Sequence, residues 1–504
     1  MRWLAILAVL RLAGAFSVPG RAVVARRDGL TRTAAARRPV SAHSRKTRGA
    51  GRALPPLSAP LTRSFAARGQ LEEAPAVEPE TLLIVVVYFL QGALSLSRLA
   101  LTFYLKDDLG LSPAEVGALT GLATAPWVIK PLYGFASDSL PIFGYRRKSY
   151  LALSGLLGCA SFAAMASPEL TGGKEALLVA NVLASAAVAC ADVVADSVVV
   201  EQTRRSANAA ANLQSVALCS RYVGAIGASV CAGEALRQLG GARGVFALTA
   251  ALPLLVTLAA SALDEKPTDE AEEEIDAKAK LGEVWQALTS KAVFRPALFL
   301  FAWQATPSCG SAFFFFSTAT VDSGGLGFDP EFIGQASALG SVAGLVGVFL
   351  YNKFFKDLPL SKVVLGTSLL SAALGCAPLV LVAHANREWG LPDRAFSLGD
   401  DVLQSALGEV GFLPLLILAA RVCPPGVEGA LFAALMSIFN VGGLVSQEAG
   451  AALTSALGVS ETDFKMLGPL IAICAISSLL PLPFLGWLDE SEPPAETAET
   501  EAAR

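Results

Sequence analysis

The chain has 504 residues, of which 53% are hydrophobic and 16% are charged, and its net charge is −4. Ordinary soluble domains carry about 25% charged residues, so this composition predicts a membrane protein. Two histidines and no GxxxxGK[ST] loop argue against a histidine metal centre and an ATP-driven pump. The eight cysteines lie singly, with no CxxC pair, and are interpreted as packing residues. We expect no cofactor, no metal and no nucleic-acid partner.

Residues 1–80 are predicted to be a targeting sequence. The stretch "MRWLAILAVLRLAGAFSVP" has the arginine, short apolar core and small residues of a signal peptide cleaved after Ala15. The next stretch is rich in Arg, Ala and Ser, with Asp28 the only acid before Glu72, which is typical of a transit peptide. Together they resemble the bipartite presequences of algae with secondary plastids and predict a plastid envelope location. A disordered basic tail is the alternative.

Twelve apolar segments follow, each long enough to cross about 30 Å of hydrocarbon as a helix rising about 1.5 Å per residue. The first six lie at residues 82–105, 112–136, 150–167, 175–200, 208–234 and 243–263. The second six lie at residues 293–320, 330–352, 361–383, 397–422, 428–456 and 464–488. We therefore predict an all-α polytopic membrane protein, surrounded by lipid, with halves at 81–263 and 293–488. A charged linker, 264–292, joins the halves, and an acidic tail, 489–504, is expected to be disordered.

An internal repeat supports the two halves. With a constant offset of 217 residues, "LGLSPAEVG" (109–117) aligns with "LGFDPEFIG" (326–334). The same offset aligns Asp192 with Glu409 and Arg204 with Arg421. Two distant segments that share one offset predict parallel six-helix pseudo-repeats, in which a substrate site lies near mid-membrane between the halves.

The basic loops predict the orientation of the chain in the membrane. Short loops dense in Lys and Arg stay on the cytoplasmic-type side. The densest are "YRRK" (145–148) and "RR" (204–205). Both termini then face this side, which is called the inner side below.

Three long segments resemble one known family. They are "KPLYGFASDSLPIFGYRRKSYL" (130–151), "ADVVADSVVVEQTR" (191–204) and a segment at 400–443 that begins "DDVLQSALGEVGFLP". Over roughly residues 80–488 the chain closely resembles the folate-biopterin transporters, a branch of the major facilitator superfamily. The resemblance implies a twelve-helix secondary carrier for folates or pterins, usually proton-coupled.

Other functions remain open, because family membership determines fold and transport better than the molecule carried. The alternatives are a carrier of another organic anion or amino acid, and a sensor that binds substrate without transport. A membrane enzyme is not expected, because His384, in a predicted loop, is the only histidine of the predicted helical body.

A gate is predicted on the inner side. Gly134, Asp138, Arg146 and Arg147 match the Gly-x3-Asp…Arg-Arg loop of the superfamily, and exposed ion pairs of about 0.2–1 kcal/mol each suit a latch that must open. The predicted gate group is Lys130, Gly134, Asp138, Arg146, Arg147, Glu201, Arg204 and Arg421. Alternatively, the basic residues only fix topology, and Lys130 with Trp127 anchors its helix at the membrane interface.

Charges inside the predicted spans are the sharpest functional signal. Arg98, Asp192, Asp196, Arg221 and Glu409 would each cost about 2.5–3.5 kcal/mol at the membrane centre, so we expect them to face the interior. Polar residues recur on the same helix faces. The predicted substrate and proton path is Gln91, Arg98, Asp192, Asp196, Gln214, Arg221, Gln304, Glu409, Asn440 and Gln447.

These residue types suit a folate. The acids would accept hydrogen bonds from the pterin ring, while Arg98 or Arg221 would bind a carboxylate. Asp192 or Asp196 would carry the proton, because two like-charged carboxylates one helical turn apart favour protonation of one of them. Alternatively, Asp192 with Arg221, or Glu409 with Arg98, form buried ion pairs that set helix register.

Two further features stay open at this stage. Pro307 and Pro414 suit broken or closely packed helices. The run "SAFFFF" (311–316), with Trp303, either stacks on a pterin ring or is apolar surface toward lipid.

Overall fold

The computed structural model describes residues 79–205, 207–267, 277–422 and 428–489. Within these ranges no side chain is described at 199–215, 277–281, 283, 420–421, 428–429 or 489. The predicted presequence, most of the linker's acidic run and the acidic tail lie outside the described residues. Throughout the described part the secondary structure is helical, apart from one isolated bridge between Ile142 and Tyr145.

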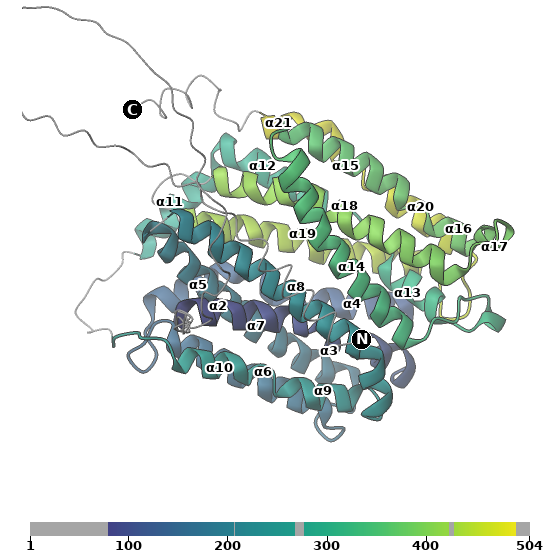
Figure 1. The fold of residues 1–504 in the computed structure, drawn as a ribbon, viewed down its shortest axis with the longest axis horizontal. Helices are drawn as coiled ribbons and strands as arrows, with labels where there is room; N and C mark the ends of the chain where they lie inside the picture. The colour runs from purple at the N-terminus through teal and green to yellow at the C-terminus, as the bar shows by residue number, and fades with distance from the viewer. Residues whose placement is uncertain (1–78, 206, 268–276, 423–427, 490–504) are drawn as a thin grey trace, which may run out of the picture. The chain divides into compact units, whose positions relative to one another are not determined.

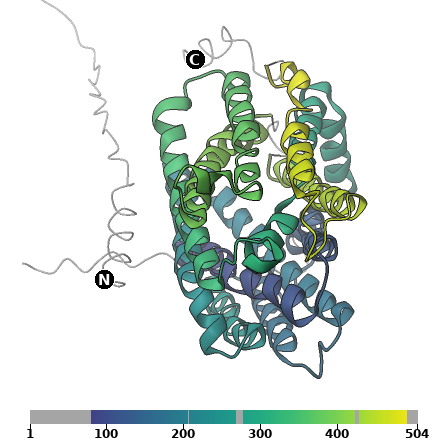
Figure 2. The same cartoon turned by 90° about the vertical axis from the view of Figure 1, so that its right-hand side faces the viewer.

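The helices fall into two sets, which Figures 1 and 2 show in purple to teal and in teal to yellow. The first set is α2 (Pro79–Ala93), α3 (Ser95–Phe103), α4 (Pro113–Leu122), α5 (Lys130–Ser139), α6 (Lys148–Ala166), α7 (Lys174–Arg205), α8 (Ala207–Gln238), α9 (Ala242–Ala250) and α10 (Leu254–Ser261). The second set is α11 (Ala277–Thr289), α12 (Lys291–Gln304), α13 (Gly310–Thr318), α14 (Pro330–Leu350), α15 (Leu360–Leu374), α16 (Pro378–Val382), α17 (Ala385–Glu388), α18 (Asp393–Arg421), α19 (Glu428–Ala456), α20 (Leu467–Ser477) and α21 (Gly486–Asp489).

Ten helices of the described residues are long and apolar enough to cross a membrane. The other two predicted spans, 112–136 and 293–320, were expected to be continuous helices, but both are divided. The first is divided into α4, a short 3₁₀ turn (Ala125–Trp127) and α5, and the second into α12 and α13. Each break contains a proline, Pro126 or Pro307, which lacks the N–H that a helix needs.

The two prolines fall under different alternatives: Pro307 lies in a helix break, whereas Pro414 lies inside the continuous helix α18. Pro414 is buried. A proline removes one backbone hydrogen bond, and neighbouring elements can accommodate that loss in a membrane helix.

The repeat is visible in the helix bounds. Shifting α7 by 217 residues gives 391–422, close to α18, and shifting α8 gives 424–455, close to α19. The aligned glycines Gly110 and Gly327 both adopt left-handed conformations, with φ of 61° and 66°. Each precedes a helix that starts at a proline, after the N-caps Ser112 and Asp329. Glycine at this position lets the chain turn into the next helix without the steric cost of a Cβ atom.

The apolar core is also divided between the halves. One buried cluster takes nearly all its members from residues 83–263, and the other large clusters come from residues 293–488. Between the halves, α8 packs on α14, while α4 and α5 pack on α19. Two further contacts join the halves: the Phe103 and Phe314 rings meet at 5.2 Å, and Arg237 lies 3.4 Å from the Glu331 carboxylate. Separate cores are what two halves need if they move relative to each other.

Candidate functional site

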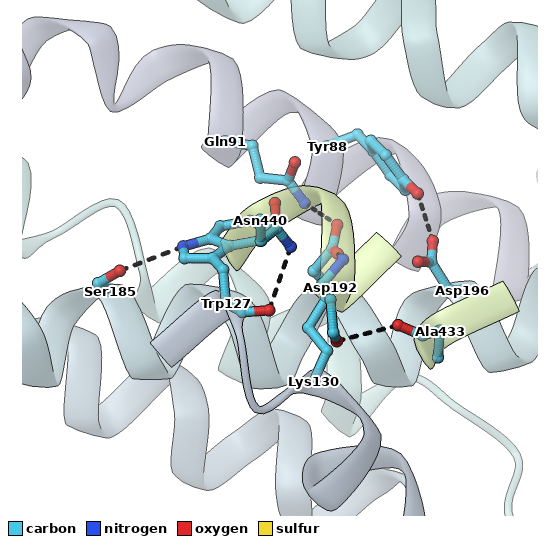
Figure 3. A network of polar contacts seen from close by, with 10 residues as sticks. Tyr88, Gln91, Trp127, Lys130, Ser185, Asp192, Asp196, Ala433 and Asn440 are labelled. Atoms are coloured by element: carbon cyan, nitrogen blue, oxygen red, sulfur yellow. Dashed lines mark hydrogen bonds and ion pairs between the residues drawn. The ribbon is translucent and has the colours of Figure 1, made fainter. Parts of the chain in front are cut away.

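A buried ion pair lies where α2, α5 and α7 meet. The Asp192 carboxylate, only 4% exposed, pairs with the Lys130 ammonium and accepts a hydrogen bond from Gln91 Nε2 (Figure 3). Lys130 is also buried, and its ammonium lies 5.0 Å from the centre of the Trp127 ring. A buried ion pair is stable only when its remaining hydrogen-bonding capacity is satisfied, and Gln91 contributes to this.

A second acid lies one helical turn further along α7. Asp196 accepts a hydrogen bond from the Tyr88 hydroxyl of α2, as Figure 3 shows. Asp192 and Asp196 thus share one face of α7, toward α2. Two carboxylates and the single ammonium of Lys130 form this cluster, which is called the charge network below.

The break between α4 and α5 connects the charge network to the other half. In a continuous helix the Trp127 carbonyl would accept from residue 131, but Pro131 has no N–H. Asn440 of α19 supplies the missing donor, with its Nδ2 3.1 Å from that carbonyl. The Trp127 ring N–H donates to Ser185 on α7 at 3.1 Å. The broken helix is therefore held by both halves, and Asn440 lies beside the charge network.

Two arginines lie next to the network without joining its ion pair. The Arg98 side chain has accessible surface, although protein surrounds it on most sides. Its guanidinium is close enough to that of Arg221 for the two like charges to repel each other. The charge of Arg221 also interacts electrostatically with Lys130 and Tyr88, and the Arg221 side chain is accessible to solvent. Neither guanidinium forms an ion pair with a described acid. The alternative of Asp192–Arg221 or Glu409–Arg98 pairs is therefore wrong, because Lys130 occupies the Asp192 carboxylate.

Lys130 is buried in the charge network rather than exposed at a membrane interface, and its part in the predicted gate stays a prediction. The break before α5 turns its side chain toward α7, where it lies buried against Asp192. Its sequence position near the inner end of a span had suggested an interface anchor. The actual partner depends on the helix break, which changes the direction of every side chain that follows it.

The other predicted path residues lie along the contacts between helices. Gln304 packs beside Gly442 and Gly443 of α19, and Gln447 of α19 packs against Gly121 of α4 across the two halves. Glu409 lies apart from the charge network, beside Tyr222 of α8 and on the wall of a cavity. The side chain of Gln214 lies outside the described part.

The inner loop of the predicted gate is held by an acid that the sequence analysis passed over. The backbone N–H groups of Arg146, Arg147 and Lys148 donate to the Glu265 carboxylate at 2.9, 3.0 and 2.8 Å. These groups begin α6, and a carboxylate is favourable at a helix N-terminus. Glu265 follows the last span of the first half, so the start of the linker is bound to this loop.

The rest of the predicted gate is only partly visible. Gly134 packs on Val193 of α7, and Asp138 is exposed without an ion pair among the described residues. The side chains of Glu201, Arg204 and Arg421 lie outside the described part, so the latch between halves stays a prediction.

Tyr88, Asp400, Asp401 and Glu448 are polar residues of the spans that sequence reasoning missed. The three acids meet the criterion that selected Asp192 and Glu409, because they also lie inside predicted spans. Asp401 lines the same cavity as Glu409, and Glu448 lies beside Gly121. Tyr88 is identifiable only through its contact with Asp196, because a tyrosine in an apolar span carries no charge signal.

Two related sets of membrane-crossing helices are the arrangement of the major facilitator fold. Solved structures resemble the chain over most of its length. A nucleoside transporter matches with a TM-score of 0.61 and 15% identity, covering 82% of this chain and 100% of that one. A D-xylose–proton symporter matches with a TM-score of 0.59 and 14% identity, covering 81% and 95%. At this identity the likeness shows the fold alone.

The sequence comparisons are more specific. The profile of the BT1 family matches residues 91–503, and the chain belongs to this family. It is 46% identical over 437 residues to a folate-biopterin transporter of Synechocystis, covering 86% of each chain. It is 28% identical over 412 residues to folate transporter 2 of Plasmodium falciparum, covering 81% of this chain and 88% of that one. The predicted family is confirmed, and the chain is a membrane transport protein rather than an enzyme.

Proposed function

We propose that the protein carries folates or pterins across a membrane by alternating access and couples their movement to protons. The names of its relatives support the substrate class. The observation that carries the coupling is the charge network, in which two acids share one buried ammonium beside two solvent-accessible arginines.

The coupling follows from charge balance. Without substrate, Arg221 acts electrostatically on the network and, with Lys130, offsets the charges of Asp192 and Asp196. A folate carboxylate bound at Arg221 would neutralise that guanidinium and leave one acid unbalanced. A buried acid beside a like charge favours its protonated form. Substrate and proton would then enter together, and the neutralised network would be free to reorient.

Uptake of labelled folate into proteoliposomes tests this function. We expect folate and pterins to exchange across the membrane, and acid outside the vesicles to raise initial uptake at least about threefold. Other organic anions and amino acids, offered in excess, should not compete. Binding of folate without counterflow would instead identify a sensor, and competition by an unrelated anion would identify another cargo.

We also propose that the protein lies in a plastid envelope and that the inner-loop charges latch the two halves. The composition of residues 1–80 supports the plastid location. The hydrogen bonds from the backbone of residues 146–148 to the Glu265 carboxylate support an ordered inner loop. A fluorescent protein fused behind residues 1–80 should reach the plastid. A reporter that stays in the cytosol would contradict the proposed targeting.

A further inference from the structure

A cavity of about 560 Å³ lies between α8 of the first half and α13, α14 and α18 of the second half. Ligand pockets usually measure about 300–1,000 Å³. The described residues of the charge network do not line it, and of the path residues whose side chains are described it includes only Glu409. The cavity is therefore a separate space whose occupant the coupling mechanism does not assign.

One wall of the cavity accepts hydrogen bonds. Asp401, Ser405 and Glu409 recur every four residues along α18, so they share one helix face, and all three line the cavity. Ser337 and Ser341 of α14 line it as well. The described lining contains no Lys, Arg or His. Two carboxylates without a cation make this wall negative and rich in acceptors.

Another part of the lining is aromatic. Phe313 and Phe314 of α13 and Phe328 and Phe332 near the start of α14 contribute rings to the cavity. Phe328 and Phe332 support each other edge to face, with their ring centres 4.5 Å apart. The lipid-facing alternative for the phenylalanine run does not describe its rings, and stacking on a pterin ring stays a prediction. Phe313 and Phe314 line the cavity, whereas the next two rings of the run are buried in the core.

The first half closes the cavity at Glu409. Tyr222 of α8 is 7% exposed, and its hydroxyl lies beside the Glu409 carboxylate. Glycine at 344 makes room for this ring, because a Cβ atom there would lie 2.9 Å from the Tyr222 hydroxyl. The preceding residue, Arg221, interacts electrostatically with Arg98. The acidic cavity and the arginine pair are therefore adjacent along α8.

We propose that this cavity binds the pteridine head of the substrate, while Arg98 and Arg221 hold the glutamate tail outside it. The inference rests on the proposed function. A pteridine presents amino and ring N–H donors along one edge, which a carboxylate accepts in parallel, and its flat ring packs against phenylalanine. The tail carries carboxylates, which Asp401 and Glu409 would repel. Charge thus sets the direction in which a folate enters the site.

Two fragments of folate separate these subsites. We would measure binding of pterin and of p-aminobenzoylglutamate to the purified full chain in detergent. Glu409→Gln should weaken pterin binding about ten- to a hundredfold, because it loses a charged hydrogen-bond acceptor. Binding of p-aminobenzoylglutamate should change less than about twofold. Arg221→Gln should give the reverse pattern, because it removes a cation from the tail site.

Phe313→Leu keeps an apolar side chain and tests the cavity if Glu409→Gln does not fold. It should weaken pterin binding several-fold and leave the tail fragment unaffected. Glu388→Gln, in the exposed helix α17, is the matched control and should alter neither. Unchanged pterin binding in the cavity variants, or equal loss of both fragments, would overturn this inference alone. If the unchanged protein binds neither folate nor either fragment, the proposed function also fails.

Discussion

Replacing Asp192 by Asn should reduce folate uptake at least about a hundredfold while the protein still reaches the membrane. The change removes the carboxylate with which the buried Lys130 ammonium pairs directly, and breaking a buried ion pair in this way costs about 3–5 kcal/mol. It also removes one of the two acids on which coupling depends. Uptake by proteoliposomes, normalised to the amount of folded carrier, is the measurement.

A double variant separates transport from stability. Lys130→Met with Asp192→Leu removes both charges, and buried pairs replaced in this way often recover the lost stability. We expect thermal stability to return and uptake to stay absent. Asp322→Asn, at an exposed position, is the control for the Asp-to-Asn change. If the double variant transports normally, the pair only fixes helix register and has no part in the mechanism.

Gly92→Ala should destabilise the carrier by about 3 kcal/mol or more, because it separates α2 from α8. A Cβ atom at position 92 would lie 1.9 Å from the Arg221 carbonyl oxygen, and a backbone atom cannot rotate away. Overpacking of a core typically costs about 1–3 kcal/mol even where side chains can adjust. The midpoint of thermal unfolding in detergent should fall by about 6 °C or more.

Gly227→Ala is the matched control for this crossing. It lies on α8 as well, but a Cβ atom there would meet nothing within 4 Å. Alanine is also a better helix former than glycine, by about 0.5–1 kcal/mol. Its unfolding midpoint should therefore stay the same or rise. Similar losses for both glycines would mean that the contact of α2 with α8 does not limit stability.

Hydrophobic length and the repeat were enough to predict the two six-helix halves. Both follow from the cost of exposing backbone and charge to lipid, which acts on every span alike. The glycines at 110 and 327 show the repeat in detail, because the matched sequence positions adopt the same left-handed conformation. The same cost selected Asp192 and Asp196 as candidate path residues, and their role stays a prediction.

The partners of those acids could not be predicted from helical spacing. Spacing places a side chain on a face of a regular helix, but Pro126 and Pro131 interrupt the helix that carries Lys130. The pairing of Lys130 with Asp192 and the contact of Asn440 with the Trp127 carbonyl both arise from that break. Asp401 could have been selected from the sequence, because it is a charged residue inside a predicted span. Its relation to Glu409 is shown only by the cavity that both residues line.

Proton movement during folate entry tests the coupling of substrate and proton most directly. A pH-sensitive dye inside proteoliposomes reports the proton, and labelled folate reports the substrate. We predict that folate added outside, with no imposed pH gradient, acidifies the lumen of vesicles that hold the unchanged protein. With Asp196→Asn, folate should still exchange but the lumen pH should not change. Folate accumulation without acidification by the unchanged protein, or equal acidification by the variant, would contradict the account.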